Sequence, residues 1–420
     1  MKKILILLFV VINISAYGQD SITLLRCYDS LANNYPLAGQ VPVINESAKL
    51  KIANLNARWL PQLNLGGKAT YQSDVVEIGG GISIPNVNFP TAPKDQYSVT
   101  LDINQVLYDG GSIKRSKELE NSKTNTGLQQ VRVDMHQVKE QVNNVYFLIL
   151  ILQKSEALLR DVEHNLQEKL EMVSSGVENG ILLPADRDNL KAELLKTGQD
   201  LETVINNRKS AIDIMNQLTG LQLSYETRFI LPVITLQDTT TDRPEQALFN
   251  YQKETLDASA KLLKSQRLPR LAAFATAGYG KPGLNILNNQ WDTYYLIGAS
   301  LKWNIWDWNQ NNRQRQVLAL QKDLVDVKKA TFDENLKISL NKAMTDIKNY
   351  ESAVKKDEQI VQLRKSVTTS AASRLKNGVI NSADYLTELT AETRARIKYE
   401  TDKINLIKSK VSYLTINGTY

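Results

Sequence analysis

Residues 178–186 read Glu-Asn-Gly-Ile-Leu-Leu-Pro-Ala-Asp, and residues 376–384 read Lys-Asn-Gly-Val-Ile-Asn-Ser-Ala-Asp. Asn-Gly is typical of a helix that ends in the left-handed conformation, and Pro or Ser followed by Ala-Asp is typical of the start of the next helix. The two copies lie 198 positions apart, and Tyr108-Asp109-Gly110 returns at the same spacing as Trp306-Asp307-Trp308. The chain therefore contains one structural unit twice.

A second pair of motifs lies upstream of each copy. Leu60-Pro61 and Leu268-Pro269 each follow a helical pattern and precede an alternating one, so we expect a helix broken by proline into a strand. These prolines lie 208 positions apart, which places ten extra residues in the first unit, in a predicted loop at 79–93. Together with Tyr108-Asp109-Gly110 and Trp306-Asp307, they form the predicted strand-helix switches.

Four segments alternate between apolar and polar residues with a period of two, which predicts strands with one apolar and one polar face. They lie at about 62–72, 97–107, 271–279 and 294–305. Each has roughly the 9 to 11 residues of a tilted membrane strand, and tyrosines and tryptophans gather at opposite strand ends, as in interfacial girdles. A soluble sheet with one solvated face remains the alternative from the strands alone.

The rest of each unit has a helical period, with apolar residues stepping by 4 and 3 as in a coiled coil. The predicted long helices span 113–176 and 311–376, the tips 177–185 and 377–383, and the return helices 186–219 and 384–416. The first long helix would measure roughly 90 to 100 Å at about 1.5 Å per residue. Helices of this length are longer than the core of a globular domain requires.

The domain organisation follows from these segments. Lys2-Lys3, an apolar run and a small-residue site predict a signal peptide over 1–18. The first repeat then covers 19–220 and opens with a short helix, a linker covers 221–246, and the second repeat covers 247–420. No later apolar run is long enough for a membrane helix, so entry into a membrane would be by strands.

The catalytic inventory is poor, with two histidines and the single Cys27 in 420 residues. We expect no catalytic site, no metal site, no cofactor and no disulfide within the chain, and we predict that the protein is not an enzyme. Removing Lys2 and Lys3 lowers the formal net charge from +6 to about +4. Because basic and acidic residues alternate, no basic stripe is available for a nucleic-acid partner.

Four antiparallel strands cannot close into a barrel, and an open edge in lipid would leave backbone groups without hydrogen bonds. The missing strands must come from other copies of the chain. Two chains would give eight strands and a barrel filled by its own side chains, whereas three would give twelve. Conduction favours the trimer.

The order and spacing of these motifs resemble the TolC-type outer-membrane efflux protein family. The resemblance covers the predicted mature chain: helix into Leu-Pro, strand hairpin, Tyr-Asp-Gly, long helix, Asn-Gly tip and returning helix, all duplicated. It implies a mixed α+β membrane protein, a homotrimer whose 12-stranded barrel contacts outer-membrane lipid and continues into an α-helical barrel in the periplasm. It also implies two partners, a periplasmic adaptor (membrane fusion) protein and an inner-membrane pump or ABC transporter.

The resemblance also assigns roles to the tips. It implies that the adaptor docks at residues of both turns, which are Asn179, Gly180, Pro184, Asp186, Leu375, Asn377, Gly378, Ala383 and Leu386. It places Asp384 near a carboxylate ring at the periplasmic entrance, with Arg374 as our expected basic partner. Thr387 stands where one member of the family has a second acid, so we expect a weaker gate here. Capping alone could also explain Asp384 and both Asn-Gly turns.

The predicted function is a passive exit duct of a tripartite efflux pump or a type I secretion system. The alternative is a coiled-coil envelope scaffold or adhesin without transport. Such a scaffold would not need amphipathic strand pairs, and a porin would need more strands and fewer helices.

Overall fold

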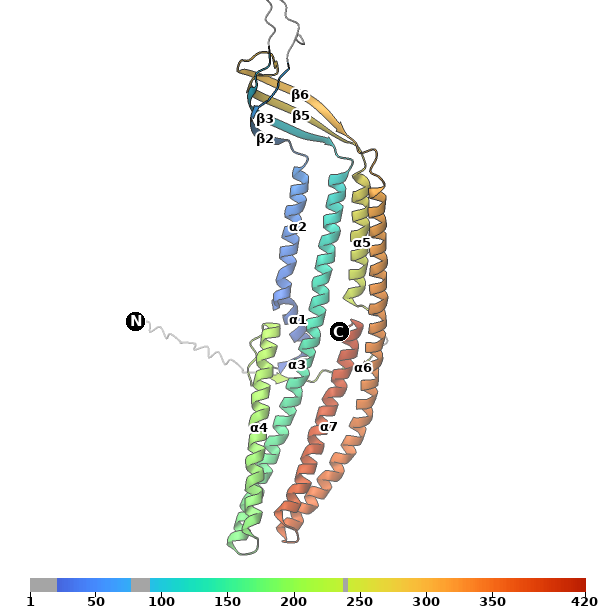
Figure 1. Cartoon of the computed structure of the whole chain (residues 1–420). Helices are drawn as coiled ribbons and strands as arrows, with labels where there is room; N and C mark the ends of the chain where they lie inside the picture. The colour runs from blue at the N-terminus through green and yellow to red at the C-terminus, as the bar shows by residue number, and fades with distance from the viewer. Residues whose placement is uncertain (1–20, 77–90, 237–240) are drawn as a thin grey trace, which may run out of the picture. The chain divides into compact units, whose positions relative to one another are not determined.

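The computed structural model describes residues 21–76, 91–236 and 241–420 (Figure 1). The predicted signal peptide and nearly all of the predicted loop at 79–93 lie outside these residues. The described chain divides into two compact units, a helical unit of residues 21–39, 132–236, 241–244 and 332–420, and a sheet unit of residues 40–76, 91–131 and 245–331. These units do not follow the two sequence repeats. Each repeat contributes to both units because its long helix runs from one into the other.

The sheet unit contains one antiparallel sheet with the strand order β2-β3-β5-β6. Its strands are β2 (Gln62–Tyr71), β3 (Asp95–Tyr108), β5 (Arg270–Lys281) and β6 (Asp292–Lys302). Each repeat supplies one hairpin, and β3 pairs with β5 to join the two hairpins (Figure 1). Within the described chain, β2 and β6 each have a strand partner on one side only.

The two faces of this sheet differ in composition, as the period of two predicted. The pairing register aligns apolar residues on one face, in the rows Leu63–Ile103–Ala275–Ile297 and Leu65–Leu101–Ala277–Tyr295. The other face carries polar rows such as Asn64–Asp102–Thr276, and we call it the polar face. The apolar face is uncovered in the single chain, where Leu65 is 79% exposed and Ile297 is 72% exposed.

Two glycines on the polar face lie under aromatic rings. A Cβ at Gly278 would lie 2.3 Å from Cζ of Tyr294, and a Cβ at Gly298 would lie 2.7 Å from Cζ of Phe274. Both distances are far shorter than a van der Waals contact. Glycine at these positions therefore lets each ring lie flat against the neighbouring strand.

Helices α2 (Gln40–Ala57) and α5 (Pro244–Ser265) lie beside the first parts of α3 (Ser112–Glu178) and α6 (Gln310–Lys376). Lys51 pairs with Glu120 at 2.8 Å, and Lys253 pairs with Asp326 at 2.7 Å. Equivalent helix pairs thus form in both repeats.

The helical unit contains two antiparallel hairpins, in which α3 turns into α4 (Pro184–Thr219) and α6 turns into α7 (Ser382–Asn417), with both turns at the same end (Figure 1). The repeat is exact in length here. Ser112 corresponds to Gln310 and Pro184 to Ser382, again 198 positions apart, and both long helices have 67 residues. Both return helices end at a left-handed glycine, Gly220 or Gly418.

A core at the other end of the helical unit surrounds Tyr146. The short strands β1 (Ser21–Ile22) and β4 (Arg228–Phe229) pair in parallel, and the Tyr146 hydroxyl lies 2.9 Å from the carbonyl oxygen of Ile22 and 2.7 Å from that of Ile230. This core takes up most of the apolar run from Tyr146 to Leu152, whereas Leu148 within the run is exposed. The predicted linker 221–246 is therefore packed structure in part.

The segment before β2 differs from the single short helix that we predicted. It forms α1 (Leu24–Asn34), a 3-10 turn (Pro36–Gly39) and α2. Pro36 cannot continue α1, and the residue before a proline disfavours helical geometry, so Tyr35 is extended. None of the helices in the described ranges is both long and apolar enough to cross a membrane.

Candidate functional site

The first helix tip is built around Gly180. Its φ of 73° places it in the left-handed region, where the absence of a Cβ removes the steric cost. The N–H of Ile181 donates to the carbonyl of Gly176 at 2.8 Å, which closes the end of α3. Asn179, Gly180 and Pro184 are all exposed on this turn.

The second tip has the same geometry around Gly378, whose φ is 66°. The N–H of Val379 donates to the carbonyl of Arg374 at 2.9 Å. Asn381 is the N-cap of α7, and its side-chain oxygen accepts from the N–H of Asp384 at 2.8 Å. Neither Gly180 nor Gly378 has a neighbouring atom within 4 Å of an added Cβ, so both turns face open space.

Asp186 joins the two tips. One carboxylate oxygen accepts from the backbone N–H of Ser382 at 2.8 Å, and the other accepts from the N–H of Leu183 at 3.2 Å. The Asp186 residue is only 6% exposed, and Ser382 is fully buried. Burial alone would raise the pKa of Asp186, but these hydrogen bonds hold it below its usual value.

An apolar cluster lies directly behind the turns and includes residues from both hairpins. Its largest fully buried members are Leu166, Leu190 and Leu375, with Tyr385 beside them. Of the predicted docking residues, Leu375 and Asp186 are therefore inside the tip, Leu386 is half-buried, and Asn377, Gly378 and Ala383 are exposed. The buried ones shape the tip, and the exposed ones form its surface.

The three predicted gate residues lie on the second tip and are exposed. The Thr387 hydroxyl donates to the carbonyl of Ala383 at 2.9 Å. Over the described ranges of this single chain, neither Asp384 nor Arg374 takes part in an ion pair. The predicted pairing of Asp384 with Arg374 across a subunit boundary stays a prediction.

The strand-helix switches lie in the sheet unit. Asp109 caps α3, because its carboxylate accepts from the N–H groups of Gly111, at 2.8 Å, and of Ile113. Asp307 caps α6 in the same way and accepts from the N–H of Asn311 at 3.1 Å. A Cβ at Gly110 would lie 2.7 Å from Cβ of Leu268, so the first switch packs closely against the second Leu-Pro turn.

Both switches share an unusual backbone. Gly110 and Gly111 have φ of 69° and 80°, and Trp308 and Asn309, at the equivalent positions, have φ of 50° and 61°. Trp306 packs edge to face with Trp308, with ring centroids 5.8 Å apart. Leu60, Pro61 and Pro269 form the turns from α2 and α5 into the sheet, and Tyr108 ends β3.

Sequence reasoning missed a buried ion pair in the helical unit. Arg208 of α4 donates to Glu156 of α3 at 2.9 Å, and both side chains are about nine-tenths buried. Arg208 also donates to the carbonyl of Tyr225 at 3.0 Å, so it ties the chain after α4 to the hairpin. The sequence gives little indication of this ion pair, because the two charged residues lie on separate helices, each among other polar residues. Nowhere in the described ranges do three or more His, Cys, Asp or Glu side chains gather as a metal site would require.

Comparison with known proteins connects this architecture to one family. A family model described as outer membrane efflux protein matches residues 38–221. No curated protein sequence matches at a significant level.

Three solved outer-membrane proteins share the fold. The Campylobacter jejuni CmeC outer membrane channel is 14% identical with a TM-score of 0.67, covering 94% of this chain and 85% of its own. The Vibrio cholerae outer membrane protein VceC is 14% identical with a TM-score of 0.68, covering 94% of this chain and 96% of its own. The open state of the Neisseria gonorrhoeae MtrE outer membrane channel is 15% identical with a TM-score of 0.67, covering 94% and 89%.

These matches confirm the family resemblance seen in the sequence and the mixed fold of long helices with a small sheet. Residues 38–221 match the outer membrane efflux protein family, and the fold of the chain is similar to that of these solved outer-membrane channels.

Proposed function

We propose that this protein is the outer-membrane exit duct of a tripartite efflux pump or a type I secretion system. The observation that carries the proposal is the sheet, which combines two unpaired edges with an uncovered apolar face. In lipid the apolar face is favourable, but the edges are not, because the bilayer core offers no hydrogen-bonding partners. Strands from other copies must pair with β2 and β6.

The copy number follows from the need for a channel. Three chains give a barrel of twelve strands, which falls in the range of outer-membrane barrels and leaves a lumen. The polar face then lines the lumen and the apolar face contacts outer-membrane lipid. The long helices of three chains would continue as an α-helical barrel in the periplasm, and each chain contributes two repeats, 19–220 and 247–420, joined by 221–246.

The tips are the proposed contact with a periplasmic adaptor, and through it with an inner-membrane pump or ABC transporter. Support comes from the two exposed Asn-Gly turns, which have matching geometry and open space around the glycine. Asp384, repeated three times around the axis, is the proposed periplasmic constriction, with Arg374 as the partner across the subunit boundary and Thr387 beside it.

Native mass measurement of the full-length protein, extracted from outer-membrane fractions, tests the assembly. We expect a trimer. A folded monomer would contradict the model, because its sheet would then expose both edges to lipid.

The orientation of the sheet is tested by two adjacent substitutions. Leu65→Lys places a charge on the proposed lipid face and should destabilise the barrel by about 2 to 4 kcal/mol if it lies near the membrane midplane. Asn64→Lys makes a matched change on the opposite face and should assemble normally. Heat resistance of the trimer on gels compares them, and an equal loss in both variants would refute the proposed orientation.

A further inference from the structure

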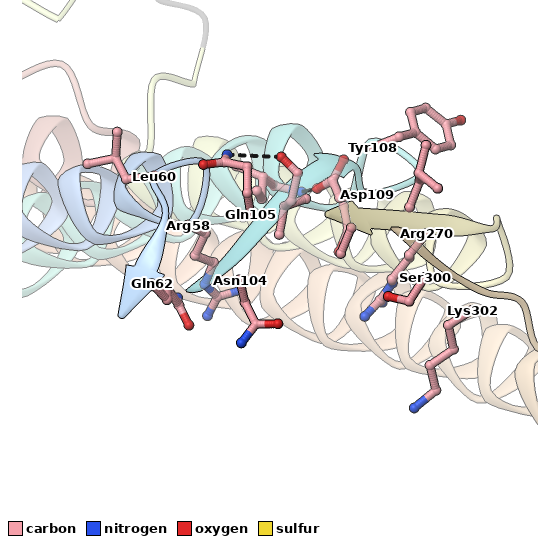
Figure 2. A pocket seen from close by; sticks show the side chains of 15 residues that line it. Arg58, Leu60, Gln62, Asn104, Gln105, Tyr108, Asp109, Arg270, Ser300 and Lys302 are labelled. Atoms are coloured by element: carbon pink, nitrogen blue, oxygen red, sulfur yellow. Dashed lines mark hydrogen bonds between the residues drawn. The ribbon is translucent and has the colours of Figure 1, made fainter. Parts of the chain in front are cut away.

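A basic cavity lies in the sheet unit, where the strands meet the helices. Its volume is about 420 Å³. Figure 2 shows Gln62, Asn104, Arg270 and Lys302 projecting to one side of the sheet, while Leu60, Gln105 and Tyr108 lie on the other. The polar lining consists chiefly of Arg58, Gln62, Asn104, Arg270, Ser300 and Lys302.

Three of these residues are cations, and we call Arg58, Arg270 and Lys302 the basic cluster. Arg270 and Lys302 are direct register partners on neighbouring strands and belong to the polar face. Like charges opposite each other in a sheet destabilise it, so an anion bound between these two exposed side chains would stabilise the pair. In the part of the chain that the structure describes, no member of the basic cluster is in an ion pair.

The nearby acids are engaged elsewhere. Asp109 also lines the cavity, but its carboxylate already accepts from the N–H groups of Gly111 and Ile113. Asp102 lies on the polar face but pairs with Thr276, six residues along β5 from Arg270, and it accepts hydrogen bonds from Thr100 and Thr276. At about 3.3 Å per residue this separation is roughly 20 Å. The lining therefore carries three cations against the single carboxylate of Asp109, and it keeps a net positive charge.

We propose that the basic cluster is a binding site for anionic groups, carboxylates or phosphates, on solutes that pass through the duct. Arginine presents a planar fork that matches such groups, and Ser300, Asn104 and Gln62 supply neutral hydrogen-bond partners around it. The proposal rests on the proposed function, because it requires the polar face to line the lumen. A threefold assembly would then carry nine such cations, which raises the local concentration of anions.

The occupant that we commit to is a solute and not the phosphate of a lipid headgroup. The cluster lies on the face opposite the rows of Leu63 and Leu65, which are the proposed lipid contacts. A lipid phosphate would have to reach around the sheet to meet it.

Sodium tripolyphosphate is the test probe, applied to the full-length protein in planar bilayers. We expect it to reduce the wild-type current, and the double variant R270Q/K302Q to require about tenfold or more tripolyphosphate for the same effect. The charge-preserving variant R270K/K302R should retain most of the block. Lys68→Gln is the matched control, because it removes one cation from the same face, six residues along β2 from Gln62. Unblocked wild-type current, or an equal loss of block in Lys68→Gln, would overturn the proposal.

Calorimetric titration of tripolyphosphate into the detergent-solubilised protein separates this proposal from the proposed function. If the protein forms no conducting channel yet binds the probe through Arg270 and Lys302, the proposed duct function is refuted and the anion-binding site is retained. If R270Q/K302Q binds the probe as tightly as the wild type does, the proposed anion site is refuted. Reconstitution in phosphatidylcholine alone, or mixed with phosphatidylglycerol, identifies the source of the anion. Displacement of the probe by phosphatidylglycerol would show that the cluster serves lipid headgroups and would refute solute binding.

Discussion

The hydrogen bond from Ser382 to Asp186 should make the two helix tips open together. Asp186→Ala removes both acceptor oxygens, so the fully buried N–H of Ser382 loses its partner without access to water. An unsatisfied buried donor costs about 1 to 3 kcal/mol. Loss of the bond to Leu183 and of a negative charge in the first turn of α4 adds roughly 0.5 to 1 kcal/mol. We expect Asp186→Ala to lower the free energy of local opening by about 1.5 to 4 kcal/mol in total.

Hydrogen exchange read by mass spectrometry measures this opening in peptides around 176–190 and 376–390. A loss of about 1.5 to 4 kcal/mol corresponds to roughly tenfold to nearly a thousandfold faster exchange. Asp384→Ala is the matched control, because Asp384 lies at the equivalent position of the second tip but is exposed. Its loss should cost only about 0.3 to 1 kcal/mol through the helix dipole. Equal effects of the two substitutions, or faster exchange in the first tip alone, would refute the proposed link.

The same link should depend on pH. Because the pKa of Asp186 is lowered in the folded protein, its contribution is present above the ordinary aspartate value of about 3.9 and is lost as the pH falls through the folded-state pKa. The difference between wild type and Asp186→Ala should therefore shrink on acidification, after correction for intrinsic exchange rates. A difference that grew toward acid pH would mean that the carboxylate is destabilising.

Three further predictions concern the tips and the sheet. Gly378→Trp should abolish transport in cells while trimer formation and membrane insertion stay normal, and normal transport would argue against docking at this turn. Asp384→Ala should give larger or more frequent openings in planar bilayers if Asp384 constricts the entrance, whereas unchanged conductance with slightly lower stability would identify it as a cap. Gly278→Ala should force the ring of Tyr294 off the strand and lower the melting temperature of the trimer, with a cost of about 1 to 3 kcal/mol per chain, and the double variant with Tyr294→Ala should recover most of that loss.

The starts and ends of the helices could be predicted because they depend on local chemistry. Asn-Gly turns, prolines and capping aspartates act within a few residues, so the 198-residue repeat showed where helices begin and end. The pairing of β3 with β5 could not be derived this way, because alternation shows which face is apolar but not which strand lies next to which. The position of α1 against Tyr146 was hidden for the same reason.

The burial of individual side chains at the tips could not be predicted from the sequence either. Asp186 and Asp384 occupy the same motif at the same offset, yet one is buried against Ser382 and the other is exposed. The difference depends on which side of each tip the neighbouring hairpin occupies. The basic cluster was missed because its members come from three separate segments, each unremarkable by itself.

The two helical hairpins have equal lengths, and this limits how the length of the helical unit can change. Removing one heptad from α3 and a matching one from α4 would raise the first turn by about 10 Å relative to the second, at about 1.5 Å per residue. Asp186 would then face the side of α7 instead of its first N–H, and the leucines behind the turns would lose their register. An insertion or deletion in one half is therefore tolerated only with the same change in the other. We expect chimaeras to assemble when both hairpins are shortened or lengthened by the same number of whole heptads. The two hairpins could then serve as a spacer of adjustable length in engineered ducts.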